Sequence, residues 1–196
     1  MRKFFFLLLV LSGIFPAYSI DTHWNLEPVV IKNGVSDNTI YNVCYGSDGF
    51  IWLSTVKGIS RYDGFRFRDY PLIMGIDSLS TPLHQAVKKL CEGPDGLYYA
   101  LLFQGGITCF DKDIEKFLPV RFDKPLELKD ILDFCWNDGS LYLVTSQGLF
   151  ESRIVRKTEG KHDFVLCLLN PEPVVRGKVA HLCSDGKTNL YFSVNQ

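Results

Sequence analysis

The sequence has no excess of charge of either sign, since 21 Lys and Arg residues stand against 22 Asp and Glu residues for a formal net charge of −1. This balance leaves no electrostatic footprint for a nucleic acid or an anionic membrane, so no nucleic-acid partner is expected. Apart from one run near the N-terminus, the sequence has no long hydrophobic stretch. No membrane-spanning segment is therefore predicted in the rest of the sequence. The composition, 46% hydrophobic and 14% aromatic, instead favours a β-rich globular protein.

The chain also lacks the residue spacings that common site chemistries require. No CxxC pair occurs, which removes the usual zinc and thioredoxin sites. The four histidines are scattered without metal-ligand spacing, and the aspartates in turns stand singly, without the clustered oxygens of a calcium site. No nucleophile–base signature, phosphate-binding loop or specific carboxylate pair is present. We therefore expect no catalytic residue, no metal site and no cofactor in this chain.

Residues 1–19 have the pattern of a secretory signal peptide. Arg2 and Lys3 form a positive start, an unbroken apolar run follows over residues 4–11, and small residues occupy the −3 and −1 positions of a cleavage site. The run is shorter than the ~20 residues that cross a bilayer, although an uncleaved anchor remains the alternative. The pattern predicts an exported protein whose mature chain begins near Ile20.

What the chain does contain is one unit repeated four times. Each copy has an Asp-Gly pair followed by a central aromatic residue, and these aromatics lie 47, 43 and 49 residues apart. A cysteine precedes the pair at the matching place in every copy. The repeated residues are Asp48, Gly49, Trp52 and Gly58, then Asp95, Gly96, Tyr99 and Gly106, then Asp138, Gly139, Tyr142 and Gly148, and finally Asp185, Gly186 and Tyr191.

A repeat of this length, made of short strands, is typical of a β-propeller. We predict an all-β fold: a partial β-propeller of about 3.5 four-stranded antiparallel blades out of an expected seven. The Asp-Gly pairs are predicted to form hairpin turns, because such turns need the positive φ that glycine accepts. The recurring aromatics are predicted to fill the space between blades, and the recurring cysteines to be small buried residues. A disulfide framework is the alternative that export leaves open.

The repeat also predicts how the chain is divided. The expected units are the signal peptide (1–19), an N-terminal segment with a ring-closing strand (20–38), blade 1 (39–77), blade 2 (78–122), blade 3 (123–172) and a truncated blade 4 (173–196). Three whole blades and part of a fourth cannot close a ring of four to eight blades. The chain is therefore expected to be the front of a larger protein.

The first copy is the most distinctive. GVSDNTIY (34–41), DGFIWLST (48–55), GI (58–59) and RYDG (61–64) closely resemble the two-component regulator propeller repeat, and later copies resemble it more loosely. The resemblance implies the N-terminal part of a periplasmic sensor region in a hybrid two-component sensor histidine kinase. It implies an oligosaccharide ligand, with the remaining blades or a second propeller as partners. It also implies a homodimer in the full-length relative.

Ligand contacts in propellers usually come from non-repeating residues in loops at one mouth of the ring. The candidates here are Trp24, His84, Phe103, Gln104 and Trp136, of which Phe103 offers a stacking face and Gln104 an amide. Ordinary surface loop residues are the alternative interpretation.

Two other functions stay open at this point. A secreted propeller enzyme, similar to the lyases that cleave streptogramin rings, would need histidines and acidic residues recurring at the mouth, and the four histidines do not occupy equivalent repeat positions. A stand-alone binding or scaffold protein would assemble through its open edges.

Overall fold

The computed structural model describes residues 34–70, 72, 85–123, 131–156 and 163–195. The predicted signal peptide, the predicted ring-closing strand at 28–32, and the candidates Trp24 and His84 lie outside these residues. Within them, no helix has the length and apolar character needed to cross a membrane.

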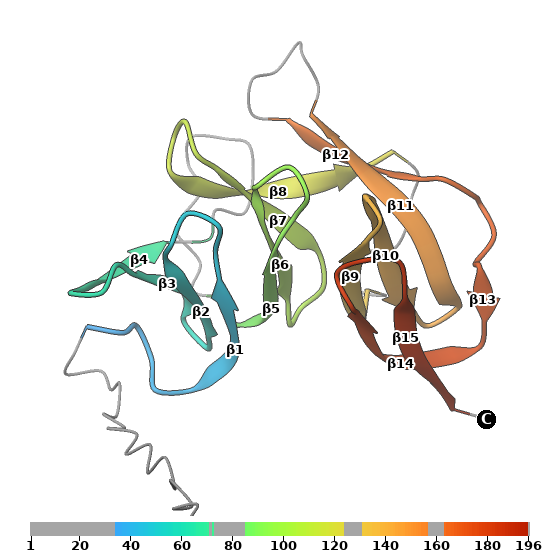
Figure 1. Cartoon of the computed structure of the whole chain (residues 1–196), viewed down its shortest axis with the longest axis horizontal. Helices are drawn as coiled ribbons and strands as arrows, with labels where there is room; N and C mark the ends of the chain where they lie inside the picture. The colour runs from blue at the N-terminus through green and yellow to red at the C-terminus, as the bar shows by residue number, and fades with distance from the viewer. Residues whose placement is uncertain (1–33, 71, 73–84, 124–130, 157–162, 196) are drawn as a thin grey trace, which may run out of the picture.

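The regular structure of the described residues consists of β-strands, as the all-β prediction requires (Figure 1). Blade 1 consists of β1 (Ile40–Tyr45), β2 (Ile51–Thr55), β3 (Gly58–Tyr62) and β4 (Phe67–Tyr70). Blade 2 consists of β5 (Val87–Glu92), β6 (Tyr98–Leu102), β7 (Ile107–Asp111) and β8 (Lys116–Phe122). Blade 3 consists of β9 (Asp133–Asn137), β10 (Ser140–Thr145), β11 (Gly148–Arg156) and β12 (Phe164–Leu168). The short β13 (Val175–Arg176) follows, and blade 4 consists of β14 (Lys178–Ser184) and β15 (Leu190–Asn195).

Within each blade, consecutive strands pair antiparallel, and we call them strands A to D in chain order. Figure 1 shows the blades following one another along the molecule, from blue-green β1–β4 through green β5–β8 to tan β9–β12 and red β14–β15. The residue boundaries expected between blades stay predictions, since the first of them falls in 73–84, outside the described residues.

The repeat register predicted from the sequence is present in the strand pairing. In all four blades the repeated cysteine on strand A lies directly opposite the central aromatic on strand B: Cys44 opposite Trp52, Cys91 opposite Tyr99, Cys135 opposite Tyr142, and Cys183 opposite Tyr191. Residues directly opposite each other share one face of a sheet, so the cysteine and the aromatic of each blade point the same way.

The hydrophobic core lies between blades, as the recurring aromatics predict. Trp52 is fully buried, and its ring packs 4.4 Å from the ring of Tyr98 in blade 2. Tyr99 belongs to the cluster that includes Phe134 of blade 3, and Tyr142 packs against the cluster between blades 3 and 4. The central aromatics of blades 1 to 3 therefore fill the space toward the following blade, whereas Tyr191 of blade 4 is 54% exposed in the described structure.

The Asp-Gly turns form as the sequence predicts. In blade 3 the turn residues Asp138 and Gly139 have φ values of 47° and 76°, the left-handed pair that a two-residue hairpin needs. Asp48 Oδ1 accepts the backbone N–H of Phe50 at 3.1 Å, closing its turn. Asp185 accepts the N–H of Lys187 at 2.8 Å, and this bond holds the pKa of Asp185 below its usual value. These aspartates therefore act as turn formers.

Blade 3 departs from the predicted four-stranded unit. Strand β12 pairs with the far half of β11, from Ser152 to Arg156, and also runs parallel to β8 of blade 2. The near end of β11, at Gly148 and Leu149, pairs instead with β13. The fourth strand of blade 3 is thus divided into two pieces, and one of them joins blades 2 and 3 into a continuous sheet. The cause is the length of β11, which extends beyond its pairing with β10 at Ser152.

A series of polar side chains connects the A strands of neighbouring blades. The position two residues before the repeated cysteine holds Asn42, Lys89, Asp133 and His181 in blades 1 to 4. Asn42 Oδ1 accepts the backbone N–H of Leu90 in blade 2 at 3.0 Å, and Asp133 Oδ2 accepts that of Leu182 in blade 4 at 3.3 Å. We call this the inter-blade position. In blades 1 and 3 it supplies an acceptor for a backbone N–H group of strand A in the next blade, because strand A has a strand neighbour within its own blade on one side only.

Lys89 completes the connection between blades 2, 3 and 4. Its ammonium lies 2.8 Å from Asp133 Oδ1 and 3.4 Å from the carbonyl oxygen of Leu182. Asp133 therefore serves two blades at once, as a counter-ion for Lys89 and as an acceptor for the N–H of Leu182.

The substitution Asp133→Ala is expected to lower the free energy of unfolding by about 1 to 2 kcal/mol, because it leaves the partly buried ammonium of Lys89 without its counter-ion and the N–H of Leu182 without its acceptor. Asp133→Asn should lose less, since the amide oxygen still accepts from Leu182. Urea denaturation measures the stability, and amide hydrogen exchange at Leu182 reports the local bond. Unchanged exchange at Leu182 in Asp133→Ala would show that the contact contributes nothing.

Candidate functional site

The described candidate residues lie at opposite ends of the blades. Phe103 and Gln104 follow strand B of blade 2, at the end where the strand B to strand C turns lie, which we call the B–C end. Trp136 lies near the finish of β9, where strand A turns into strand B, which we call the A–B end. The structure therefore does not bring Trp136 together with Phe103 and Gln104.

At the B–C end, Phe103 contacts blade 1. Its ring lies 4.6 Å from the ring of Tyr41 at a tilt of 56°, and the two side chains are 50% and 45% exposed. The backbone N–H of Phe103 donates to the carbonyl oxygen of Ala86 at 3.1 Å, which fixes the one-residue insertion in this turn. Gln104 is exposed beside it. This pair offers an open aromatic surface, and neither residue lines the two pockets described below.

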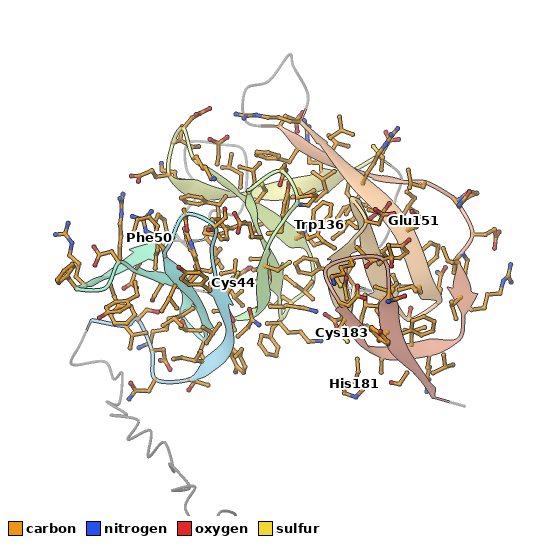
Figure 2. All side chains as sticks on the ribbon, viewed as in Figure 1. Cys44, Phe50, Trp136, Glu151, His181 and Cys183 are labelled. Carbon is orange, nitrogen blue, oxygen red and sulfur yellow. The ribbon has the colours of Figure 1, made fainter. Side chains whose placement is uncertain are left out.

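At the A–B end, Trp136 lines a pocket of ≈ 440 Å³. The pocket is formed by the A–B turns of blades 2, 3 and 4, and its volume falls in the range typical of small-molecule sites. Figure 2 places Trp136 between the green and tan blades. We call this the Trp136 pocket; its lining residues are Glu92, Gly93, Pro94, Trp136, Asn137, Asp138, Gly139, Gly186 and Lys187.

The walls of the Trp136 pocket are held in place by specific contacts. The Trp136 ring packs 5.2 Å from the ring of Tyr99, and its buried indole N–H makes no hydrogen bond to any described residue. Asn137 accepts from the Ser184 hydroxyl at 2.7 Å and donates to the carbonyl oxygen of Thr188 at 3.3 Å, which connects blades 3 and 4. The A–B turns of these two blades are thereby fixed relative to each other.

The chemistry of the pocket is mixed. Trp136 supplies an aromatic surface, Asp138 an exposed carboxylate, and Lys187 an exposed ammonium. Glu92 adds a second carboxylate, which accepts the backbone N–H of Ser47 in blade 1 at 2.8 Å. An aromatic surface with a few converging polar groups suits a compact, hydroxyl-rich ligand.

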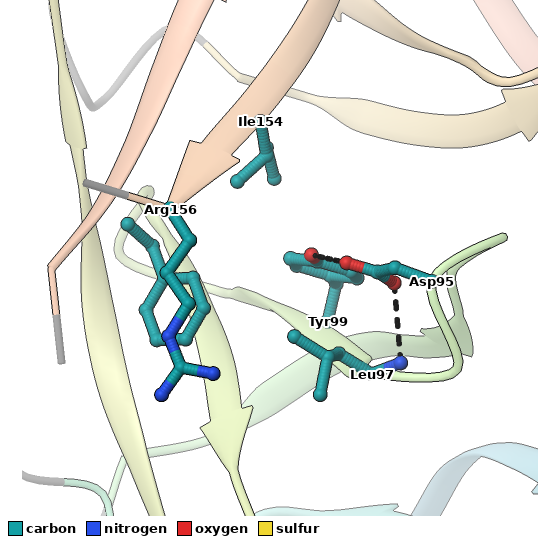
Figure 3. A pocket seen from close by; sticks show the side chains of 6 residues that line it. Asp95, Leu97, Tyr99, Ile154 and Arg156 are labelled. Atoms are coloured by element: carbon teal, nitrogen blue, oxygen red, sulfur yellow. Dashed lines mark hydrogen bonds between the residues drawn. The ribbon is translucent and has the colours of Figure 1, made fainter. Parts of the chain in front are cut away.

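A second pocket of ≈ 320 Å³ lies between blades 2 and 3 (Figure 3). Its polar groups bond to one another: the Tyr99 hydroxyl donates to Asp95 Oδ2 at 2.6 Å, and the N–H of Leu97 donates to Asp95 Oδ1 at 3.1 Å. Arg156 lies over the ring of Phe164 and donates to the Asp113 carboxylate at 3.1 Å. Burial raises the pKa of Tyr99, which keeps its hydroxyl protonated as a donor. These contacts assign the second pocket to the packing between blades.

The cysteines show no sign of a reactive site in the described residues. All six thiols are free of disulfide bonds. Burial raises the pKa of Cys91, Cys109 and Cys135, which disfavours the nucleophilic thiolate. No group of three or more His, Cys, Asp or Glu residues in the described ranges is placed to hold a metal ion.

Sequence reasoning identified Trp136 but missed most of its surroundings. Glu92, Asn137 and Lys187 belong to the A–B turns of three different blades, so no short motif contains them. One signal was available: in the repeat alignment Trp136 and Glu92 occupy the same position, one residue after the repeated cysteine. Aligning the repeats could therefore have grouped the non-repeating residues next to the Asp-Gly turns as candidates at one end of the blades.

The fold and the repeat place the chain among propeller proteins, and comparisons with known proteins agree. Residues 34–57 match the family model described as two component regulator propeller. The match covers the segment from Gly34 through β1 and β2, and it confirms the resemblance inferred from the sequence. A comparison with curated proteins gives no match.

Two solved structures share the fold of this chain. The extracellular domain assigned to the hybrid two component system BT4673 from B. thetaiotaomicron superposes with a TM-score of 0.60 at 17% identity, covering 88% of this chain and 25% of that one. The corresponding domain assigned to BT3049 from the same organism gives a TM-score of 0.53 at 17% identity, covering 64% of this chain and 18% of that one. This chain thus spans a quarter or less of the length of these two solved structures.

Proposed function

We propose that this chain is the N-terminal part of the ligand-sensing propeller of a hybrid two-component system, exported to the periplasm. The observation that carries the proposal is the two component regulator propeller match at residues 34–57, within a fold shared with extracellular domains of such systems. On this proposal the remaining blades or a second propeller, the kinase and a homodimeric partner belong to the full-length protein. The chain itself contributes ligand binding and no catalysis.

The ligand that we propose is an uncharged oligosaccharide bound in the Trp136 pocket. A sugar ring presents C–H groups that pack on an indole and hydroxyls that both donate and accept hydrogen bonds. Asp138 and Lys187 can accept and donate hydrogen bonds at the rim of the pocket. Two carboxylates and one ammonium around the pocket favour a neutral sugar over an acidic one.

Binding at this place also offers a way to transmit a signal. The pocket is formed by turns from blades 2, 3 and 4, so a ligand that fills it contacts three blades at once. A ligand that binds most tightly to one spacing of the three turns stabilises that spacing relative to all other spacings. Ligand binding would thereby restrict the movement of blades 2, 3 and 4 relative to one another. A domain further along the chain can respond to that restriction.

The proposal is tested by isothermal titration calorimetry of the full chain against a panel of neutral oligosaccharides. Lys187→Ala removes one hydrogen bond, and Asp138→Asn exchanges a charged acceptor for a weaker neutral one, so each variant should weaken binding about 5- to 10-fold, the effect of about 1 kcal/mol. Both side chains are exposed, and Asn is well tolerated at the positive φ of residue 138, so the fold should be retained.

The double substitution of Phe103 and Gln104 by alanine, at the B–C end, is the control and should leave the affinity unchanged. If this control loses binding while Asp138→Asn keeps it, the sugar site is at the B–C end instead. Absence of binding to every oligosaccharide of the panel would overturn the glycan proposal.

A further inference from the structure

The A–B turns of blades 1 and 2 have the same structure. In each turn the N–H of the second glycine donates to the carbonyl oxygen of the first at 3.0 Å. The donor and acceptor are Gly49 and Gly46 in blade 1, and Gly96 and Gly93 in blade 2. In each turn the aspartate Oδ1 also accepts, at 3.1 Å, the N–H two residues further along the chain. Ser47 and Pro94 therefore hold equivalent places, three residues after the repeated cysteine.

Hydrogen bonds close the interface between blades 1 and 2 at the A–B end. Glu92 is the first residue after the repeated cysteine of blade 2, and both of its carboxylate oxygens accept from Ser47 of blade 1. The backbone N–H of Ser47 donates to Oε2 at 2.8 Å, and its hydroxyl donates to Oε1 at 2.5 Å. We call this pair of bonds the clasp. The turn also lies directly against blade 2, because a Cβ added at Gly46 would collide with the hydroxyl of Tyr98.

The interface between blades 3 and 4 is closed in a similar way. Ser184 is the first residue after the repeated cysteine of blade 4, and its hydroxyl donates to Asn137 Oδ1 in the A–B turn of blade 3 at 2.7 Å. The Asn137 amide in turn donates to the carbonyl oxygen of Thr188 at 3.3 Å. At both interfaces the residue that follows the repeated cysteine thus bonds to the A–B turn of the preceding blade.

The interface between blades 2 and 3, which the Trp136 pocket spans, has neither partner of the clasp. Pro94 takes the place of Ser47, and proline has no backbone N–H and no hydroxyl to donate. Trp136 takes the place of Glu92, and an indole has no acceptor oxygen. Within the described residues, no hydrogen bond joins the A–B turns of these two blades. The Trp136 ring packs on the ring of Tyr99 instead.

We propose that Pro94 and Trp136 determine where this propeller binds its ligand, because together they prevent the clasp that closes the interface between blades 1 and 2. The A–B turns of blades 2 and 3 then stay apart, and the space beside them is the Trp136 pocket. Proline is favoured at the second position of a β-turn, so the loss of the donor requires no other change in the turn. The identity of the ligand rests on the proposed function, whereas the open interface does not.

The test is to build the clasp into the interface between blades 2 and 3. Pro94→Ser with Trp136→Glu supplies both donors and the carboxylate, whereas Pro94→Ser alone and Pro94→Ser with Trp136→Ala lack the carboxylate and are the matched controls. Solvent exchange of the N–H of residue 94, measured by NMR, should be about 10-fold slower with the carboxylate than in either control. The N–H of Ser47 is the internal reference for folding and should exchange slowly in all three variants. Equal exchange at residue 94 would overturn the proposal.

A second variant examines the clasp that already exists and leaves the core aromatics in place. Glu92→Ala removes the acceptor of Ser47, so the N–H of Ser47 should exchange about 10-fold faster than in the unaltered chain. Unchanged exchange at Ser47 would show that the carboxylate does not close this interface, and the proposal would then be wrong even if Trp136→Glu failed to fold.

Binding measurements separate this inference from the proposed function. Toward an oligosaccharide that binds the unaltered chain, Pro94→Ser should keep the affinity, and Pro94→Ser with Trp136→Ala should weaken it about 3- to 10-fold through the lost aromatic surface. Pro94→Ser with Trp136→Glu should weaken it by about 10-fold more, because the clasp also closes the pocket. Equal affinities of the two double variants would overturn this inference alone. If no oligosaccharide binds the unaltered chain, the proposed function fails, and the exchange rate at residue 94 still decides whether the interface closes.

Discussion

Trp52→Ala is expected to lower the free energy of unfolding by about 3 to 5 kcal/mol, the cost of removing a large aromatic from a packed core. The side chain is completely buried, and the rings of Tyr98, Phe110 and Tyr70 lie within 5.3 Å of its ring. The indole N–H makes no hydrogen bond to a described residue, so the loss is one of packing. The cavity would open between blades 1 and 2.

The measurement is urea denaturation followed by circular dichroism, with all variants at one protein concentration. Trp52→Phe should lie between the alanine variant and the unaltered chain, because it keeps part of the ring contact. Phe65→Ala, at a 95% exposed side chain in the same blade, should change the stability by no more than about 0.5 kcal/mol. A loss below about 1 kcal/mol in Trp52→Ala would show that the two blades do not depend on this packing.

Gly148→Ala is expected to destabilise the chain by about 3 kcal/mol or more, because two costs combine. Gly148 has a φ of +142°, a conformation that residues with a side chain rarely adopt. A Cβ added there would also collide with the carbonyl oxygen of Val175, the residue of β13 that pairs next to it. Strand β13 would have to leave β11, and it leads directly into β14 of blade 4.

Gly58→Ala is the matched control, because Gly58 occupies the same repeat position in blade 1 with a φ of +127°. An added Cβ there would lie 3.5 Å from the carbonyl oxygen of Tyr70, an ordinary contact. Gly58→Ala should therefore lower the free energy of unfolding only by the backbone strain, about 1 to 3 kcal/mol. The difference between the two variants in urea denaturation measures the approach of β13, and equal losses would contradict its role.

The sequence predicted the blades because each of them depends on local patterns. The strand B to strand C turns at Gly58 and Gly148, and the register that places Cys44 opposite Trp52, follow from residues only a few positions apart. Turn chemistry and the alternation of side chains along a strand set these features before any distant contact forms.

The candidate site was predicted less well, for a physical reason. Trp136 was selected because it interrupts the repeat, and the structure places it in a pocket. Phe103 and Gln104 were selected for the same reason but lie at the other end of the blades. Whether two loops face the same end depends on how many strands separate them, and a list of non-repeating residues does not contain that information.

The sequence by itself determined the repeat, the β-strands, the hairpin turns and the aromatic residues between blades, because these are short-range properties. Only the tertiary structure decided that β12 pairs with β8, that β13 occupies the near end of β11, and that three A–B turns meet around Trp136. It also decided which repeated residues are exposed, since Tyr191 has the same local pattern as the buried Trp52 and Tyr99. Burial is set by whether another blade is adjacent in space, and no local pattern encodes that.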